Sequence, residues 1–195
     1  MNTILQALRP AVSIFVLLTV VTGVAYPLLV TGVAQTAFAH TANGSIVTVN
    51  GQAVGSSLIG QSFSEPKYFW SRPSATATVS NNGAASGGSN LGANNPALAD
   101  AVKGRIEALR AADAGNNLPV PIDLVTTSGS GLDPDISLAA AAYQAPRIAR
   151  VRGLRLDAVQ AVIAKHAQRP WLGVMGEPRV NVLAMNLELD GNAAR

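Results

Sequence analysis

The sequence contains no cysteine among its 195 residues. Disulfide bonds, zinc fingers and thiol catalysis are therefore excluded. Histidine is also scarce, with two residues, and neither an H-E-x-x-H pair nor another cluster of metal ligands is present. The net charge of +3 comes without a long Lys/Arg run or a helix-turn-helix pattern, which argues against nucleic-acid binding. We predict no bound metal and no nucleic-acid partner.

Asp, Glu, Lys and Arg are all absent from residues 10–64. The first half of this stretch, residues 11–39, is strongly apolar. As an α-helix it would extend about 43 Å, enough to cross a hydrocarbon core about 30 Å thick. Ala37 and Ala39 also fit the small-x-small pattern of a signal-peptide cleavage site, but the run is longer than the apolar region of about 7–15 residues found in signal peptides. We predict a retained transmembrane helix in which Pro27 produces a bend.

Basic residues are distributed unequally around this predicted helix. Arg9 precedes it, whereas the next basic residue after it is Lys67. Because positive charge accumulates on the cytoplasmic side, we predict a short cytoplasmic N-terminus at 1–10, a transmembrane helix at 11–39 and an extracytoplasmic domain at 40–195. The predicted partners of the chain therefore include the lipid bilayer.

The patterning of residues 40–195 predicts both helices and strands, and therefore an α/β or α+β domain. Asn50-Gly51 between two β-rich arms predicts a hairpin. A C-terminal alternation of apolar and polar residues predicts a half-buried strand. The expected elements are a hairpin at 45–55, helices at 96–113, 133–145, 147–154 and 156–167, an extended segment at 118–127 and a strand at 180–190, with Pro146 interrupting the second helix.

Two surface segments are candidates for partner contact. Four of the nine aromatic residues lie within residues 63–70, where they either fill a core, pack beside the membrane or form a binding hot spot with a nearby arginine. A cluster of four arginines at residues 147–155 is either a solvated face or a docking surface for an acidic partner or an anion. The candidate partner-binding residues are Tyr68, Phe69, Trp70, Arg72, Arg147 and Arg150.

Residues 80–95 are mostly Gly, Ser and Asn. Such a composition is typical of a linker or a mobile loop. A loop of this length inside a compact domain is unusual unless function or a partner orders it. Both interpretations stay open.

The segment TTSGSGLDPDIS, residues 126–137, has three possible roles. Asp133 and Pro134 fit a helix start, because the carboxylate accepts from free amides and proline suits the first helical position. The same amides could hold a phosphate, although two carboxylates at the mouth would repel one. A cation site falls short of an EF-hand pattern. A membrane-tethered serine hydrolase using Ser128 or Ser130 is a remote alternative, since no G-x-S-x-G is present.

Five segments of the chain, taken in order, resemble the C chain of the Kdp potassium-transporting ATPase of bacteria and archaea. The resemblance runs from the N-terminal anchor to the last strand and includes GQSFSEPKYFWSRPSA, SGGSNLG, VPIDLVTTSGSGLDPDIS, QAPRIARVRGL and GEPRVNVLAMNLELD. It implies a one-helix, non-catalytic subunit of the cell inner membrane. Its partners would be an A chain that conducts potassium and a B chain, a P-type ATPase, that hydrolyses ATP.

The resemblance also implies a role for ATP. The family's C chain is described as a catalytic chaperone that raises the affinity of the B chain for ATP. Carried over to this sequence, the candidate nucleotide contacts are Ser128, Gly129, Ser130, Gly131 and Gln144. ATP is cytoplasmic, however, whereas the charge distribution predicts a domain outside. The alternative is an extracytoplasmic lid at the potassium entrance of the A chain, in which Glu65, Asp133 or Asp135 attracts the ion.

Overall fold

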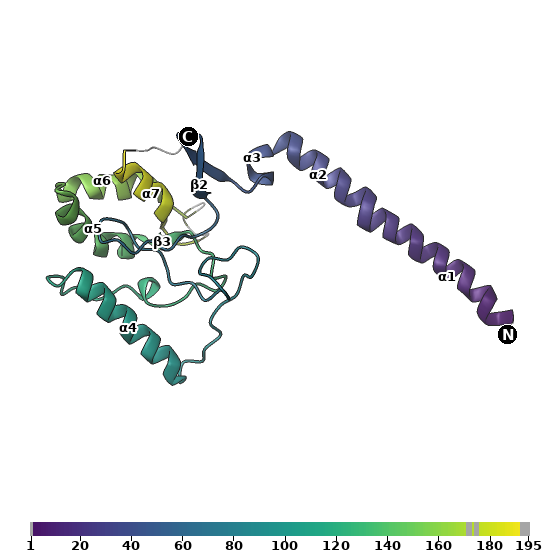
Figure 1. Ribbon diagram of the computed structural model, residues 1–195, viewed down its shortest axis with the longest axis horizontal. Coiled ribbons are helices and arrows are strands. Elements are labelled where there is room, and N and C mark those ends of the chain that lie inside the picture. Colours follow the sequence, from purple (N-terminus) through teal and green to yellow (C-terminus); the bar gives the residue numbers. More distant parts are fainter. Residues whose placement is uncertain (1, 171–172, 174–175, 192–195) are drawn as a thin grey trace. The chain divides into compact units, whose positions relative to one another are not determined.

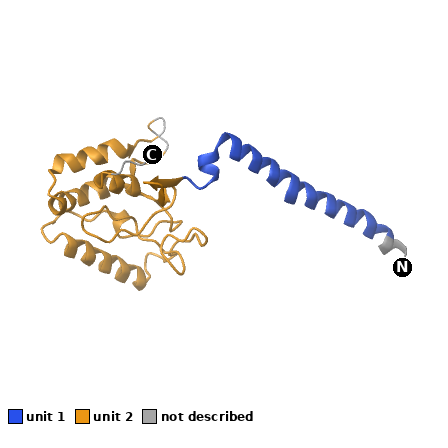
Figure 2. Ribbon diagram, turned by 45° about the horizontal axis from the view of Figure 1, so that its top comes forward, with its two compact units in different colours: residues 1–45 blue, residues 46–195 orange. Residues whose placement is uncertain are grey.

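The computed structural model describes residues 2–170, 173 and 176–191. The chain divides into two compact units, Met1–Ser45 and Ile46–Arg195 (Figure 2). The first unit is helical and the second contains helices and two small sheets, so the fold is α+β with one long apolar helix at the N-terminus.

The first unit is a nearly continuous helix made of α1 (Asn2–Val20), the π-helical turn η1 (Val21–Ala25) and α2 (Tyr26–Ala37), followed by the short α3 (Ala39–Ala42). Residues Gln6–Ala37 are long and apolar enough to cross a bilayer, with a mean hydropathy of 2.2 and an apolar window that is 0% buried. An apolar surface that no part of the chain covers suits a lipid environment.

Pro27 gives the helix a π-helical turn. It lies at the start of α2, directly after η1. A proline inside a helix cannot donate a backbone hydrogen bond, and its ring presses on the carbonyl four residues earlier. In η1 the amide of Tyr26 donates to the carbonyl of Val21, five residues earlier, so the turn before the proline is wider than an α-turn. The sequence-based expectation at Pro27 is a bend, and the structure shows a π-helical turn directly before this proline.

Strands β1 (Ile46–Val49) and β2 (Gln52–Ser56) form the predicted hairpin at the start of the second unit. Asn50 and Gly51 have φ values of 50° and 79°, as a two-residue hairpin turn requires. The pairing shifts register between Val47 and Thr48.

The main body of the second unit combines four helices with a three-stranded antiparallel sheet whose order is β3-β5-β4. Helices α5, α6 and α7 pack together, and α4 lies apart from them in Figure 1. The elements are α4 (Pro96–Ala112), the 3-10 turn η2 (Ile122–Leu124), β3 (Asp135–Ser137), α5 (Leu138–Arg152), α6 (Leu156–His166), β4 (Ala167–Gln168), β5 (Arg179–Asn181) and α7 (Val182–Leu189).

The core gathers side chains from all of these helices and from the aromatic segment. Helix α5 is its centre, because eight of its residues are buried, including Tyr143, Gln144 and Arg147. Phe69 and Ile136 from outside the helix are also fully enclosed. Helix α4 joins this core along one side, through Leu109 and the half-buried Val102 and Ile106. The predicted helices at 96–113 and 156–167 are confirmed.

The expected helix start at Asp133 and Pro134 is wrong. Residues 135–137 form β3, paired with β5, and α5 begins at Leu138. Ser137 caps the helix, because its hydroxyl accepts a hydrogen bond from the amide of Ala140. The helix cap is therefore four residues later than expected, because residues 135–137 pair with β5.

Pro146 does not interrupt the helix, contrary to the expectation. Helix α5 runs through it from Leu138 to Arg152 and ends at Gly153, which adopts φ 64°. The carbonyl that loses its helical partner belongs to Ala142, which lies on the exposed side. Solvent can satisfy this carbonyl, and the buried residues on the other side hold the helix in place.

The expected C-terminal strand at 180–190 is largely a helix. Only Arg179–Asn181 is extended, and α7 follows at Val182. The side-chain oxygen of Asn181 accepts from the amide of Ala184 and caps α7. The residues of α7 that face the core, Val182, Met185, Asn186 and Leu189, recur at helical spacing.

The Gly/Ser/Asn-rich residues 80–95 lie within the second unit and are not a linker between units. They form no helix or strand, but they contact the loop at 127–131. The amide of Gly87 donates to the carbonyl of Ser130 over 2.8 Å, and the Ser89 hydroxyl lies 3.1 Å from that of Thr127. The segment predicted as extended, 118–127, contains the turn η2.

Candidate functional site

The loop Thr126–Leu132 is held in place by hydrogen bonds from Ser74 and from residues 86–87. The hydroxyl of Ser74 donates to the carbonyl of Gly131 over 2.7 Å, and Ser86 and Gly87 both donate to the carbonyl of Ser130. Gly131 has φ 69°, and a Cβ atom there would lie 2.6 Å from the carbonyl oxygen of Gly87. Glycine is therefore required at this position by both conformation and space.

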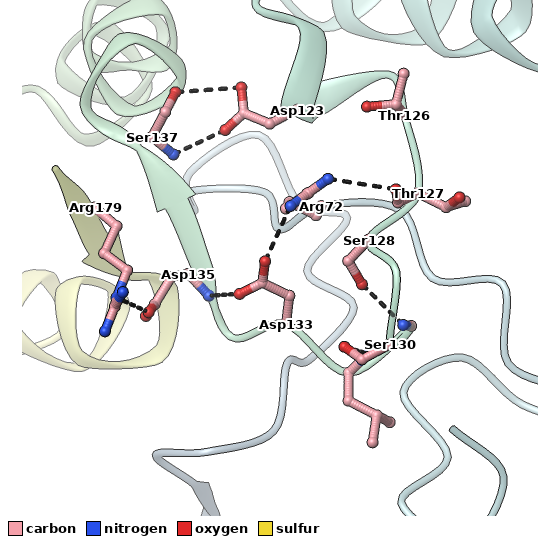
Figure 3. Close-up of polar contacts among 12 residues, drawn as sticks. Arg72, Asp123, Thr126, Thr127, Ser128, Ser130, Asp133, Asp135, Ser137 and Arg179 are labelled. Carbon is pink, nitrogen blue, oxygen red and sulfur yellow. Dashed lines mark hydrogen bonds and ion pairs between the residues drawn. The ribbon is translucent and has the colours of Figure 1, made fainter. Parts of the chain in front are cut away.

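The serines of this loop bond mainly to its own backbone. The buried Ser128 accepts from the amide of Gly131 at 2.9 Å, and the exposed Ser130 accepts from the amide of Leu132 at 3.1 Å (Figure 3). Among the described residues, the amides of Gly129 and Ser130 donate to no other group. Two successive amides of exposed residues thus have no acceptor within the described chain, and an external acceptor such as a phosphate oxygen could bind them.

Arg72 connects this loop to a group of carboxylates. Figure 3 shows it between Thr127 and Asp133, where it donates to the Thr127 carbonyl over 3.3 Å and pairs with the Asp133 carboxylate at 3.0 Å. The other carboxylate oxygen of Asp133 accepts from the amide of Asp135. Asp133 therefore stabilises the turn into β3 and does not cap a helix.

A groove of about 330 Å³ opens beside these carboxylates. Asp135, at its edge, pairs with Arg179 at 2.8 Å. Burial nevertheless raises the pKa of Asp135 above its ordinary value, against the opposing effect of Arg179. The groove is lined by Arg72, Asp123, Asp133, Asp135, Ile136, Ser137, Glu177, Pro178 and Arg179. Four carboxylates against two guanidinium groups give it a negative potential.

The side chain of Gln144 forms no hydrogen bond with the Ser128–Gly131 loop among the described residues. It is buried, accepts from the amide of Trp70 at 2.8 Å and donates to the Trp70 carbonyl at 3.2 Å. It also accepts from Arg147 at 2.8 Å. The structure thus uses Gln144 to fix the backbone of the aromatic segment.

The candidate partner-binding residues fall into two groups. Phe69 and Arg147 are buried, and Arg147 lies 4.7 Å from the centre of the Trp70 ring. Tyr68, Trp70 and Arg72 are half-buried at the surface. Arg150 is exposed and pairs with the buried Asp113 at 2.6 Å. The second group is accessible at the surface.

No group of three or more His, Cys, Asp or Glu residues in the described part of the chain could hold a metal ion. The histidine in the second unit, His166, lies 2.6 Å from Glu188 and not beside a serine. The interactions of Ser128 and Ser130 run to backbone groups. The described residues therefore do not bring a serine, a histidine and a carboxylate together as a hydrolase needs.

Sequence reasoning missed two parts of this region. Asn186 holds Phe69 from both sides, because it accepts from the Phe69 amide and donates to its carbonyl. The signal that could have predicted this role is the position of Asn186, a polar residue on the otherwise apolar face of α7. Arg105 of α4 lines a second cavity, and a single arginine on a helix carries no such signal.

Comparison with known proteins identifies a family that matches nearly the full length of the chain. The family described as "K+-transporting ATPase, c chain" matches residues 8–191. A "Potassium-transporting ATPase KdpC subunit" from Variovorax paradoxus is 63% identical over 189 residues, which cover 97% of this chain and 98% of the relative. A protein with the same description from Sorangium cellulosum is 57% identical over 187 residues, covering 96% and 98%. The chain belongs to the family of C chains of the potassium-transporting ATPase.

Proposed function

We propose that this chain is a non-catalytic accessory subunit that docks its second unit, from outside the cytoplasm, on the potassium-conducting A chain. Membership of the family supports a subunit of a potassium-transporting ATPase. The observation that supports the placement is the charge distribution: Arg9 lies near the N-terminal end of the apolar helix, and no Asp, Glu, Lys or Arg follows until Glu65. This asymmetry favours a cytoplasmic N-terminus in the inner membrane.

The surface of the second unit supports a role near the ion entrance. The groove around Asp123, Asp133 and Asp135 has an excess of carboxylates, and a negative potential raises the local concentration of a cation such as potassium. Glu65, which is exposed, would add to this field. The surface aromatic residues Tyr68 and Trp70, with Arg72 and Arg150, would contact the A chain. Effects on ATP use by the B chain would then pass through the complex.

Direct contact with ATP is the second candidate, and the free amides of Gly129 and Ser130 favour it. In that arrangement the Ser128–Gly131 loop would bind a phosphate of the nucleotide on the B chain and act as the catalytic chaperone. Gln144 contributes less to this candidate, because its side chain is buried and fully occupied by Trp70 and Arg147. This candidate requires the second unit to be cytoplasmic.

Single-cysteine labelling separates the two candidates, because the chain has no cysteine of its own. Ala84 is exposed in the second unit, and Gln6 is exposed at the N-terminal end of the apolar helix. In intact cells, A84C should react with a membrane-impermeant maleimide, whereas Q6C should react only after lysis. If Q6C reacts in intact cells and A84C reacts only after lysis, the extracytoplasmic placement is wrong and direct contact with ATP is favoured.

A further inference from the structure

A second cavity, of about 280 Å³, lies between α4, η2 and the segment 62–74. Its walls combine aromatic rings, hydroxyl groups and two guanidinium groups. The lining residues that matter here are Phe63, Trp70, Arg72, Arg105, Leu109 and Leu124. The acidic groove described above has a different lining, and only Arg72 belongs to both.

Of the two cationic groups, Arg105 has unused hydrogen-bonding capacity, whereas the charge of Arg72 is already paired with Asp133 at 3.0 Å. Arg105 is half-buried, and its one hydrogen bond within the described chain runs to the carbonyl of Val125, at 2.7 Å. It forms no ion pair with a described residue. The Nε atom of Arg72 is buried and has no hydrogen-bond partner among the described residues.

An anion in the cavity would give Arg105 the ion-pair partner that the described residues do not provide. Partial burial lowers the pKa of Arg105, because the guanidinium is partly withdrawn from water. No carboxylate lines the cavity to compensate. Buried charges in proteins are normally paired, and a planar guanidinium fork matches a carboxylate in particular.

The aromatic and aliphatic residues of the lining favour an anion that carries an apolar group. Trp70 and Phe63 offer ring surfaces, and Leu109 and Leu124 add aliphatic surface. A volume of about 280 Å³ is at the lower limit for small-molecule pockets and suits a group the size of one side chain.

We propose that this cavity binds a carboxylate carried on a small planar or apolar group, with Arg105 as its cationic contact. The carboxylate could come from a small organic acid in solution or from an acidic side chain of a neighbouring subunit. The proposal depends neither on the side of the membrane nor on contact with ATP, so labelling results for A84C leave it unaffected.

Fluorine NMR of the full-length chain in detergent tests the site directly. We expect para-fluorobenzoate to bind in the millimolar range or tighter, and the uncharged para-fluorobenzamide to bind at least about tenfold more weakly. Arg105→Met should weaken benzoate binding by about tenfold or more, whereas Arg105→Lys, which keeps the charge, should retain part of it. Lys103→Met, an exposed cation on the same helix, is the matched control and should bind like the unaltered chain.

Co-purification with the other subunits of the transporter distinguishes the two sources. Loss of association in Arg105→Met but not in Lys103→Met identifies a subunit carboxylate. Benzoate binding without any change in association identifies a free acid. If Arg105→Met alters neither benzoate binding nor association, the proposal is wrong. Circular dichroism and thermal melting of Arg105→Met confirm that the variant is folded when these comparisons are made.

Discussion

At the scale of single residues, Arg147 holds the aromatic segment against helix α5. Its guanidinium donates to the carbonyls of Pro66 and Tyr68 and to the side chain of Gln144, and it stacks on Trp70. Burial lowers the pKa of Arg147 to about 10, so it remains charged near pH 7. A buried charge with all its contacts satisfied specifies one position for the segment that carries the surface aromatic residues.

Replacing Arg147 with methionine should destabilise the second unit by about 3 kcal/mol, because the carbonyls of Pro66 and Tyr68 and the buried Gln144 lose their donor. Thermal unfolding of the full-length chain, followed by circular dichroism, measures the change. Arg155→Met is the control: this side chain is 85% exposed and pairs with a similarly exposed Asp157, so its loss should cost less than about 0.5 kcal/mol. Equal effects of the two substitutions would contradict the role of Arg147.

Two glycines of one loop allow a sharper comparison. Gly131→Ala should destabilise the chain by about 2 kcal/mol or more, because φ is 69° and the new Cβ atom would lie 2.6 Å from both the Gly87 carbonyl and the Thr76 methyl group. Gly129→Ala should change stability by less than about 0.5 kcal/mol, because nothing lies within 4 Å of its Cβ position. The same unfolding measurement applies. A stable Gly131→Ala variant would show that the loop relaxes.

At the scale of elements, the sequence predicts the long periodic helices correctly. It does not predict the type or the boundaries of segments whose pattern fits both a helix and a strand. Asn50-Gly51 and the apolar stripe of α4 each admit one interpretation, and both were correct. The C-terminal segment admits two, because Leu183, Met185, Leu187 and Leu189 alternate while Val182, Met185 and Asn186 recur with helical spacing. The Asn181 cap and packing against the core decide in favour of the helix.

The candidate site was predictable in composition and not in its contacts. Glycine and serine at 128–131 marked the loop, and the aromatic residues at 68–70 marked the second segment. The groups that hold them come from distant parts of the chain: Gly87 bonds to Ser130, and Asn186 bonds to Phe69. Such pairings depend on tertiary packing, which residue types and local spacing do not encode.

The pairing of helices α6 and α7 should depend on pH. Glu188 of α7 accepts from Lys165 at 2.9 Å and lies 2.6 Å from His166, both at the end of α6. The hydrogen bond from Lys165, assisted by that from His166, lowers the pKa of Glu188 below 4.5. A carboxyl whose pKa is lowered on folding stabilises the fold above its unfolded pKa, and this contribution is lost as the pH falls through the folded value.

Glu188→Gln should therefore cost about 0.5 kcal/mol near pH 7, and the difference from the unaltered chain should disappear well below pH 4.5. Thermal melting at a series of pH values measures this difference. Glu107→Gln, on the exposed side of α4 and without an ion pair to a described residue, should show no comparable dependence. A Glu188→Gln difference that grows as the pH falls would contradict the assignment.

At the scale of the whole molecule, two units with opposite solvent preferences share one chain. The helix of residues Gln6–Ala37 has no buried window and no charge after Arg9, whereas the second unit has its own core around α5. The first unit therefore has the length and composition of a membrane-spanning helix, whereas the second has the buried core of a folded domain. This division suits a subunit that belongs to a membrane-embedded transporter, as its family does.

A charge near the middle of the apolar helix tests the anchor. Val20→Arg should reduce the fraction of the chain that sediments with membranes, because an arginine at the centre of a membrane helix costs about 2.5–3.5 kcal/mol on insertion. Leu8→Arg, beside Arg9, should sediment like the unaltered chain, because a long basic side chain near the end of the helix can reach the interface. Equal retention of both variants would contradict membrane insertion of this segment.

The π-helical turn before Pro27 has a consequence for neighbouring transmembrane helices. One additional residue in a turn rotates everything that follows by about 100° relative to an uninterrupted α-helix. A stripe of side chains that begins on α1 therefore does not continue along the same side of α2. A single straight helix that packed against one stripe of α1 would meet a different set of side chains beyond η1, so two separate neighbours could each recognise one half of the anchor.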